Sequence, residues 1–211
     1  MYVPPPFAQT DPAEIATFMR KHSFATVVTH DGHVPFASQV PVLHYREPGP
    51  HGRIIAHIAR ANPQWRHFDN GQEVLVMFHG PHAYISPAWY QTQPAVPTWN
   101  YAAVHAYGRP RIITNHSVLV SMLEELVETY ERDRENRWPG VLPEEYRDKM
   151  IGGIVGFEIE ITRIEAKYKL GQNRSAADIQ SVVSALGASS DETGRELAAM
   201  MARQQEKGPF T

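Results

Sequence analysis

The residues from Ile154 to Lys167 alternate between apolar and polar side chains. The apolar side chains that fall on one side are Val155, Phe157, Ile159, Ile161 and Ile164. This alternation is typical of a half-buried antiparallel strand, with one face against a core and the other in water. Because a lone strand is unstable in water, the chain must fold around a sheet that includes this segment.

Turn-forming residues are abundant in the rest of the chain. The 14 glycines and 17 prolines make up about 15% of the 211 residues, against about 12% in an average protein. Asp31-Gly32 is a hairpin signal between strands expected at Phe24–Thr29 and Val34–Val40, and the second strand runs into Pro41, which belongs near a strand end or an edge. Further strands are expected at Arg53–Ile58, Glu73–Phe78 and Thr98–Ile113, the last as two strands or one bent strand.

Helix signals precede, separate and follow these strands. Asp11, Pro12 and Glu14 predict a capping box with proline at the first helical position. Asn115 or His116 caps a second helix, whose expected apolar face is Val118, Met122, Leu123, Leu126, Val127 and Tyr130. Other helices are expected near Pro143–Met150 and, on either side of Gly187, at Ala176–Leu186 and Asp191–Gln205. This order predicts an α+β fold with an antiparallel barrel or sheet, as one domain with a helical tail.

Charge and composition exclude several classes of protein. The net charge of −3 and the pI near 6.4 provide no global attraction to nucleic acid or anionic lipid. The chain has no cysteine, which excludes disulfides and thiolate metal sites. No apolar run approaches the ~20 residues of a membrane span, and Met1–Pro6 does not look like a signal peptide. We therefore expect a cytoplasmic protein that is not inserted in a membrane.

Familiar catalytic motifs are missing, and the histidines do not replace them. The glycine-rich nucleotide loops, the nucleophile elbow and the zinc-protease motif are all absent from the sequence. Eleven histidines suggest a metal site, with His30/His33 and His79/His82 as the closest pairs. Both pairs are expected in turns with no acidic triad nearby, so solvated loop histidines are the better interpretation and no metal ligand is assigned.

Two segments carry features of a cofactor site. Tyr84–Tyr101 concentrates large aromatic side chains, which form either core packing beneath a loop or a wall for a flat ligand. Arg60 follows a buried strand and suits a phosphate, because a guanidinium binds two oxygens at once; a surface arginine that caps the next turn is the alternative. Lys167, Lys169 and Arg174 suit a phosphate or, less well, a nucleic-acid backbone, although a solvated strand end is the commoner role of such charges.

The tail helices have the outline of a helix-turn-helix. The second helix, however, carries Asp191, Glu192 and Glu196 among its charged residues. A helix that approaches DNA phosphates should be more basic. We therefore expect these helices to pack on a partner subunit.

Long sequence segments resemble the PaiB family, described as FMN-binding negative transcriptional regulators. The matching segments are Met1–Pro4 with Phe7, His57–Trp65, Phe78–Tyr90, Val96–Tyr101, Val104–Gly108, Lys169-Leu170 and Gln172–Arg174. The resemblance implies an antiparallel FMN-binding split β-barrel with peripheral helices, related to the pyridoxamine-phosphate-oxidase-like flavoproteins. It also implies a homodimer with FMN at the subunit interface. We expect the barrel domain at residues 1–174, and at 175–211 a helical tail that packs on the barrel or the partner subunit.

The resemblance and the residue chemistry together suggest a cofactor site. FMN needs cationic and neutral donors for its phosphate and a flat slot with main-chain donors for its ring. We assign Arg60 and Lys169 to the phosphate, with Asn62 and Gln172 as neutral donors and His57 beside them. The strand residues Ser38, Gln39, Val40 and Pro41 are expected along the ring, and Trp99 and Tyr101 as an aromatic wall. No catalytic residue is assigned.

The leading functional hypothesis is an FMN-binding repressor of the PaiB type, although the charge of the chain does not support direct DNA binding. The first alternative is an FMN-dependent oxidoreductase that uses a nicotinamide or another small donor, since flavin itself carries the electrons. A haem-binding split barrel is the second alternative, and an absorption spectrum separates flavin from haem.

Overall fold

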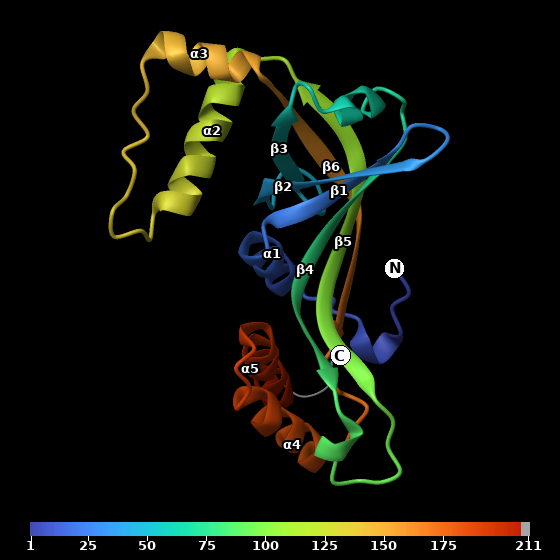
Figure 1. The fold of residues 1–211 in the computed structure, drawn as a ribbon. Coiled ribbons are helices and arrows are strands. Elements are labelled where there is room, and N and C mark those ends of the chain that lie inside the picture. The colour runs from blue at the N-terminus through green and yellow to red at the C-terminus, as the bar shows by residue number, and fades with distance from the viewer. Residues whose placement is uncertain (208–211) are drawn as a thin grey trace. The chain divides into compact units, whose positions relative to one another are not determined.

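The structure is a computed structural model and describes residues 1–207 (Figure 1). Its strands are β1 (Phe24–His30), β2 (Pro35–Tyr45), β3 (Arg53–Ala59), β4 (Val74–Ile85), β5 (Thr98–Ile113) and β6 (Ile154–Lys169). Its helices are α1 (Pro12–Lys21), α2 (His116–Glu131), α3 (Glu144–Gly152), α4 (Ala176–Gly187) and α5 (Glu192–Lys207). Short 3-10 turns are η1 (Pro5–Phe7), η2 (Pro63–His67) and η3 (Pro87–Trp89). No described helix is long and apolar enough to cross a membrane.

The chain forms two compact units. The first contains residues 1–18, 78–105 and those from Glu165 onward, and the second contains residues 19–77 and 106–164. The strands form a closed barrel in the order β1-β2-β3-β6-β5-β4. The pairings of β1 with β2 and β4, of β2 with β3, and of β3 with β6 are antiparallel and lie in the second unit. The predicted antiparallel barrel is confirmed.

The first hairpin forms as predicted, but its second strand is longer than expected. The Asp31 carboxylate accepts from the N–H groups of His33 and Val34 at 2.7 Å and so stabilises the turn. Strand β2 continues past Pro41 because it changes partner there, pairing with β1 as far as Pro41 and with β3 from Val42 onward. The prediction that this strand ends at Val40 is therefore wrong.

Strand β4 also corrects a prediction. His79 and His82 lie within this strand, not in a turn, and both are exposed. Gly80 lets the Phe18 ring pack closely against this strand, because a Cβ there would lie only 2.5 Å from that ring. Within residues 1–207, no three histidine, aspartate or glutamate side chains are grouped closely enough to hold a metal ion.

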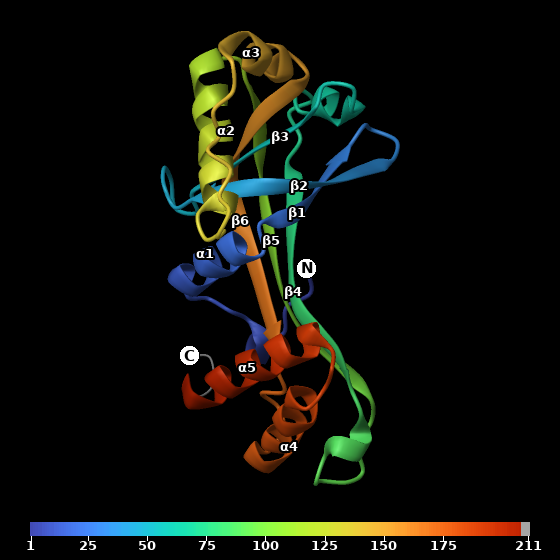
Figure 2. The same ribbon diagram turned by 60° about the vertical axis from the view of Figure 1, so that its left-hand side comes forward.

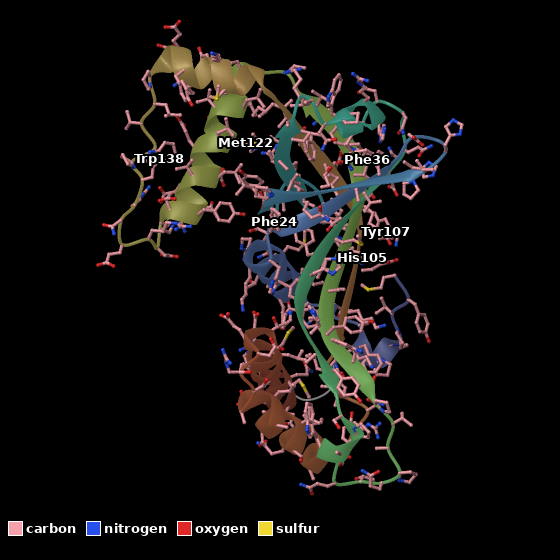
Figure 3. The ribbon with its side chains drawn as sticks, viewed as in Figure 1. Phe24, Phe36, His105, Tyr107, Met122 and Trp138 are labelled. Carbon is pink, nitrogen blue, oxygen red and sulfur yellow. The ribbon has the colours of Figure 1, made fainter. Side chains whose placement is uncertain are left out.

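Helix α2 packs on the barrel of the second unit with a face rotated from the predicted one. Asn115 caps it as predicted, accepting from the N–H of Ser117 at 2.9 Å. Leu119, Met122 and Leu126 are buried together with Leu43, Ile55 and Ile151. Figure 3 shows Met122 on this helix. Val118 and Tyr130 were expected on this face but are each 42% exposed. Leu119 replaces Val118 because Gly156 leaves room for it: a Cβ at Gly156 would lie 2.1 Å from the Leu119 side chain.

The first unit holds the two tail helices, α4 and α5, which pack against each other. The Asp178 carboxylate on α4 accepts from the N–H groups of Gln91 at 2.8 Å and Thr92 at 3.0 Å, so α4 is joined to the loop after η3. These contacts hold the pKa of Asp178 below its ordinary value, with the Thr92 N–H as the main cause. The packing of residues 175–211 on the barrel or a partner subunit stays a prediction, and residues 208–211 lie outside the described residues.

Candidate functional site

A gap opens in the barrel where the pairing of β2 with β3 stops. The paired residues run from Tyr45↔Arg53 to Val42↔Ala56. The next position on β2 is Pro41, which has no N–H to contribute to a ladder. Beyond it, β2 stays paired with β1 and β3 stays paired with β6, so each strand has one edge toward the gap.

Main-chain groups of both strands face this gap. The N–H of Val42 donates to the carbonyl of Ser23, on the β1 side, at 2.9 Å. Because these groups alternate in direction along a strand, those of Ala37 and Gln39 point away from β1 and toward the gap. Directly after β3, the N–H of Arg60 donates to the carbonyl of Gly153 at 2.8 Å, on the β6 side. The groups of His57 and the N–H of Ala59 therefore face the gap by the same reasoning, while the Ala59 carbonyl accepts from the N–H of Asn62 at 2.9 Å.

Side chains at the gap line a hollow of about 400 Å³. Its lining consists of Ala37, Ser38, Gln39, Val40, His57, Ile58, Ala59 and Asn62. The structure therefore brings together most of the predicted ring-binding strand with His57 and Asn62. Pro41 does not line the hollow, but it lies where the ladder ends.

Asn62 fixes the wall of this hollow. Its side-chain N–H donates to the Ser38 hydroxyl at 2.9 Å, and its side-chain oxygen accepts from the N–H of Gln64 at 3.0 Å, which caps η2. The predicted role of Asn62 was donation to a phosphate. The observed bonds show that its oxygen and one of its two N–H groups hold the protein together.

His57 presents an unsatisfied polar atom at the same place. The Nδ1 atom of His57 is buried and has no hydrogen-bond partner among the described residues. Burial also lowers the pKa of His57 below its ordinary value of 6.5. A neutral imidazole beside the hollow can donate to or accept from a ligand.

Arg60 lies at the end of β3, directly after Ala59. Its Nε donates to the carbonyl of Gly152 and its Nη2 to that of Ile154, both at 2.8 Å. These bonds fasten the end of β3 to the junction between α3 and β6. The arginine is exposed, so its remaining N–H groups are free to meet an anion.

The other predicted residues belong to the first unit. Lys169 donates from Nζ to the carbonyl of Trp99 at 2.7 Å and also bonds the hydroxyl of Thr98. Burial lowers the pKa of Lys169, and the positive charges of Lys167 and Arg174 lower it further. A site crowded with positive charge suits a phosphate.

Gln172 and the two predicted aromatic residues have structural contacts in the first unit. The Gln172 side chain donates to the carbonyl of Tyr168 and accepts from the N–H of Leu170, which fixes the turn after β6. Trp99 is 53% exposed and meets the Tyr84 ring edge-on, with 6.2 Å between ring centroids. The Tyr101 ring lies 5.2 Å from the ammonium of Lys167.

Comparison with known proteins identifies the family. The model of the family described as "Putative FMN-binding domain" matches residues 1–163. The chain belongs to this family. It is also 39% identical over 209 residues to protease synthase and sporulation protein PAI 2 of Bacillus subtilis, covering 98% of this chain and 99% of that protein. The predicted PaiB relationship and the prediction of FMN as the family's cofactor are confirmed.

Two solved structures share the fold of this FMN-binding family member. The FAD and heme binding protein from Mycobacterium smegmatis has a TM-score of 0.60 and 12% identity, covering 82% of this chain and 78% of that one. The flavocytochrome Anf3 from Azotobacter vinelandii has a TM-score of 0.59 and 17% identity, covering 77% of this chain and 69% of that one. The predicted α+β split-barrel fold is confirmed.

The residues at the gap fit a flavin ring. The ring of FMN carries a row of nitrogen and oxygen atoms that need donors and acceptors. The gap offers the main-chain groups of Ala37 and Gln39 and the unsatisfied His57 nitrogen. A strand edge with unpaired N–H groups and an orphaned imidazole is chemically suited to this row of atoms.

Sequence reasoning missed three lining residues and a buried support of the site. Ala37, Ile58 and Ala59 line the hollow, and they lie beside the predicted residues Ser38 and His57 in the sequence. Gln64 is fully buried, and its side-chain N–H groups donate to Val27, Thr29 and Phe36 of the first hairpin. The sequence signal that could have indicated Gln64 is its position two residues after Asn62, inside a turn that begins with Pro63.

Proposed function

We propose that this protein binds FMN as a homodimer, with the flavin ring against the β2 edge of the gap, and acts as a flavin-dependent regulator. The observation that carries the proposal is the end of the β2–β3 ladder at Val42↔Ala56, beside Pro41, which leaves the main-chain N–H groups of the preceding β2 residues facing a hollow of about 400 Å³. Phosphate binding by Arg60 and Lys169 is part of the same proposal. We also propose that the protein is located in the cytoplasm.

A backbone substitution tests the ring-binding edge. Gln39→Pro removes the N–H that faces the gap and leaves the pairing with β1, because that N–H does not point toward β1. Gln39→Ala is the matched control, since it removes the side chain and keeps the N–H. FMN titration followed by flavin fluorescence should show weaker binding of at least about fivefold for Gln39→Pro and little change for Gln39→Ala.

Two further measurements make this experiment decisive. Urea unfolding of both variants identifies any general loss of fold, and Ala37→Pro repeats the test at the second N–H that faces the gap. Wild-type affinity in both proline variants would contradict the assignment of the ring to this edge. No FMN binding by the wild-type protein would contradict the cofactor proposal itself.

Exposure of the gap supports a second candidate, an FMN-dependent oxidoreductase. Ala37, Gln39 and Ala59 are all exposed, so a small electron donor has room to approach a bound ring. Bound flavin supplies the electron-transfer chemistry, and the chain's own residues orient the ring. Bleaching of the flavin absorption by NAD(P)H under anaerobic conditions, with recovery by an oxidant, would establish this activity. A haem spectrum in the purified protein would favour the haem-binding alternative.

Regulation through DNA needs its own test. The net charge of −3 gives no general attraction to a duplex, so DNA binding by this chain requires a local patch or a partner protein. Binding of a random duplex that weakens steeply with salt would support a local patch. Absence of binding at about 50 mM salt would exclude direct contact and leave an indirect mechanism.

A further inference from the structure

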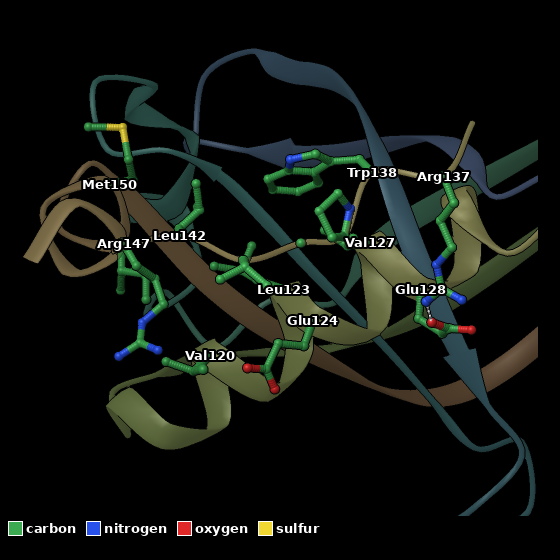
Figure 4. A pocket seen from close by; sticks show the side chains of 14 residues that line it. Val120, Leu123, Glu124, Val127, Glu128, Arg137, Trp138, Leu142, Arg147 and Met150 are labelled. Carbon is green, nitrogen blue, oxygen red and sulfur yellow. Dashed lines mark hydrogen bonds and ion pairs between the residues drawn. The ribbon is translucent and has the colours of Figure 1, made fainter. Parts of the chain in front are cut away.

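A second hollow lies in the second unit, between α2, α3 and the segment that joins them. Figure 2 shows this segment returning along α2 before α3 begins. The hollow has a volume of about 480 Å³, within the usual range for small-molecule sites. Its apolar walls include Val120, Leu123, Val127, Trp138, Leu142 and Met150 (Figure 4).

Large apolar side chains around this hollow remain in contact with water. Trp138 is 43% exposed, Leu142 is 37% exposed and Met150 is 46% exposed. Single exposed apolar residues are common on protein surfaces, but a group of them around one concavity marks a binding site. A ligand that covers these side chains would remove a substantial apolar area from contact with water, and this removal favours binding.

Polar bonds hold the walls of the hollow in place. Arg137 pairs with Glu128 of α2, and the N–H of Trp138 donates to the Glu131 carboxylate at 2.8 Å. Arg134 donates from Nε to the carbonyl of Tyr130 at 3.1 Å. The joining segment is therefore fixed to α2 by its polar groups, while the apolar side chains between them leave a space.

The charges at the hollow favour a cation. Arg137 is paired with Glu128, and Arg147 lies 3.7 Å from Glu144 and 3.3 Å from Asp148. Glu124 lines the hollow without an ion-pair or hydrogen-bond partner within residues 1–207. The uncompensated charge is thus a carboxylate, and the Trp138 ring adds a face that attracts cations.

We propose that this hollow binds a small organic ammonium ion with an apolar body, such as an arylalkylamine, with Glu124 opposite the ammonium group. The apolar walls take the body of the ligand, and Trp138 lies beside it. This site is separate from the proposed flavin site, because the two share no lining residue. Amine binding therefore does not depend on the FMN proposal.

Calorimetry with three ligands of similar shape tests the proposal. We expect 2-phenylethylammonium to bind the wild-type protein, 2-phenylethanol to bind about fivefold more weakly, and 3-phenylpropionate more weakly still. Glu124→Gln should lower the amine affinity to that of the alcohol. The control Glu145→Gln makes the same change at an exposed position of α3 outside the hollow and should leave amine binding intact.

Several outcomes would overturn the proposal. They are no amine binding at about 10 mM, equal binding of amine and alcohol by the wild-type protein, or unchanged amine affinity in Glu124→Gln. Trp138→Ala should lower the affinity for all three ligands. Unchanged affinities in this variant would place the binding elsewhere. An FMN titration of Glu124→Gln, expected to match wild type, separates failure here from failure of the flavin site.

Discussion

The side-chain amide of Asn62 donates a hydrogen bond to the hydroxyl of Ser38 across the gap between β3 and β2, with a donor–acceptor distance of 2.9 Å. The ladder between these strands has already ended at Val42↔Ala56. This bond therefore replaces main-chain pairing as the connection between the two walls of the hollow. It links Ser38 and Asn62, which both line the hollow of about 400 Å³.

Removing this connection should weaken FMN binding more than it weakens the fold. Ser38→Ala leaves the Asn62 N–H without its acceptor, and we expect the free energy of unfolding to fall by about 0.5–1.5 kcal/mol. Asn62→Ala also removes the cap of η2, at a further cost of about 1 kcal/mol. Urea unfolding and FMN titration measure the two effects. Ser121→Ala, on the exposed side of α2, is the control, and FMN affinity unchanged in both variants would show that the bond does not shape the site.

Arg60 should affect both stability and phosphate binding, and riboflavin separates the two. Arg60→Ala removes two bonds to the α3–β6 junction, so we expect a loss of stability of about 1 kcal/mol for this exposed side chain. If Arg60 also contacts the phosphate, FMN affinity falls by about 1.5–3 kcal/mol. Riboflavin, which has no phosphate, should lose much less. An equal loss for FMN and riboflavin would restrict Arg60 to its structural bonds.

Acid should destabilise the protein through its buried histidines. Burial lowers the pKa values of His44, His57 and His105 from 6.5. With folded-state pKa values below the unfolded value, the stability these groups contribute is fully present above pH 6.5. It is lost as the pH falls through their folded-state pKa values.

Urea unfolding between pH 7.5 and pH 5 measures this effect. His57→Gln keeps a polar side chain that does not titrate, so its unfolding free energy should depend less on pH than that of wild type. A wild-type slope in His57→Gln would mean that His57 takes no part in the acid response.

Gln64 should be a strong determinant of the stability of the first hairpin. Its side-chain N–H groups donate to the carbonyls of Val27 and Phe36 at 2.9 and 3.2 Å, and Gln64 is fully buried. Gln64→Leu fills similar space but leaves these carbonyls without that donor, so we expect a loss of about 1–3 kcal/mol. Thermal unfolding with and without FMN checks this, and Gln91→Leu, at an exposed position, is the control. Wild-type stability in Gln64→Leu would show that water replaces the lost donors.

The sequence allowed prediction of elements that depend on local signals. The Asp31-Gly32 turn, the Asn115 cap and the alternation along β6 are determined by neighbouring residues. The turn and the cap are observed, and the alternation is observed from Val155 to Ile161, whereas Ile164 is only half-buried. The continuation of β2 past Pro41 could not be predicted, because it depends on pairing with β3. The close packing of Phe18 on Gly80 of β4 could not be predicted either, because it joins distant parts of the chain.

The candidate site was predictable in its residue types and not in its contacts. Ser38, Gln39, Val40, His57 and Asn62 were found through strand positions and family resemblance, and they line one hollow. Arg60 bonds the carbonyls of Gly152 and Ile154, which lie 92 and 94 positions further along the chain. No local pattern contains that information, because only the pairing of β3 with β6 brings these residues together.

Lys169 should make FMN binding sensitive to alkaline pH. Its folded-state pKa lies below 10.5, chiefly through burial and then through Lys167 and Arg174. Below that pKa the ammonium attracts the phosphate, and above it the neutral amine does not. We therefore expect FMN affinity to fall as the pH rises through the pKa of Lys169, while riboflavin affinity changes little. A bound phosphate favours the ammonium form, so FMN binding near that pH should also take up protons.

Lys169→Gln and Lys149→Gln provide a matched comparison for this effect. Lys169→Gln should bind FMN less tightly at neutral pH, by about tenfold, and should lose the difference between FMN and riboflavin in alkaline solution. Lys149→Gln makes the same change at an exposed position of α3 and should behave as wild type. Calorimetry in two buffers with different ionisation enthalpies measures the proton uptake. An FMN affinity that follows the same pH curve in Lys169→Gln as in wild type would remove Lys169 from the phosphate site and leave its bonds to Thr98 and Trp99 as its role.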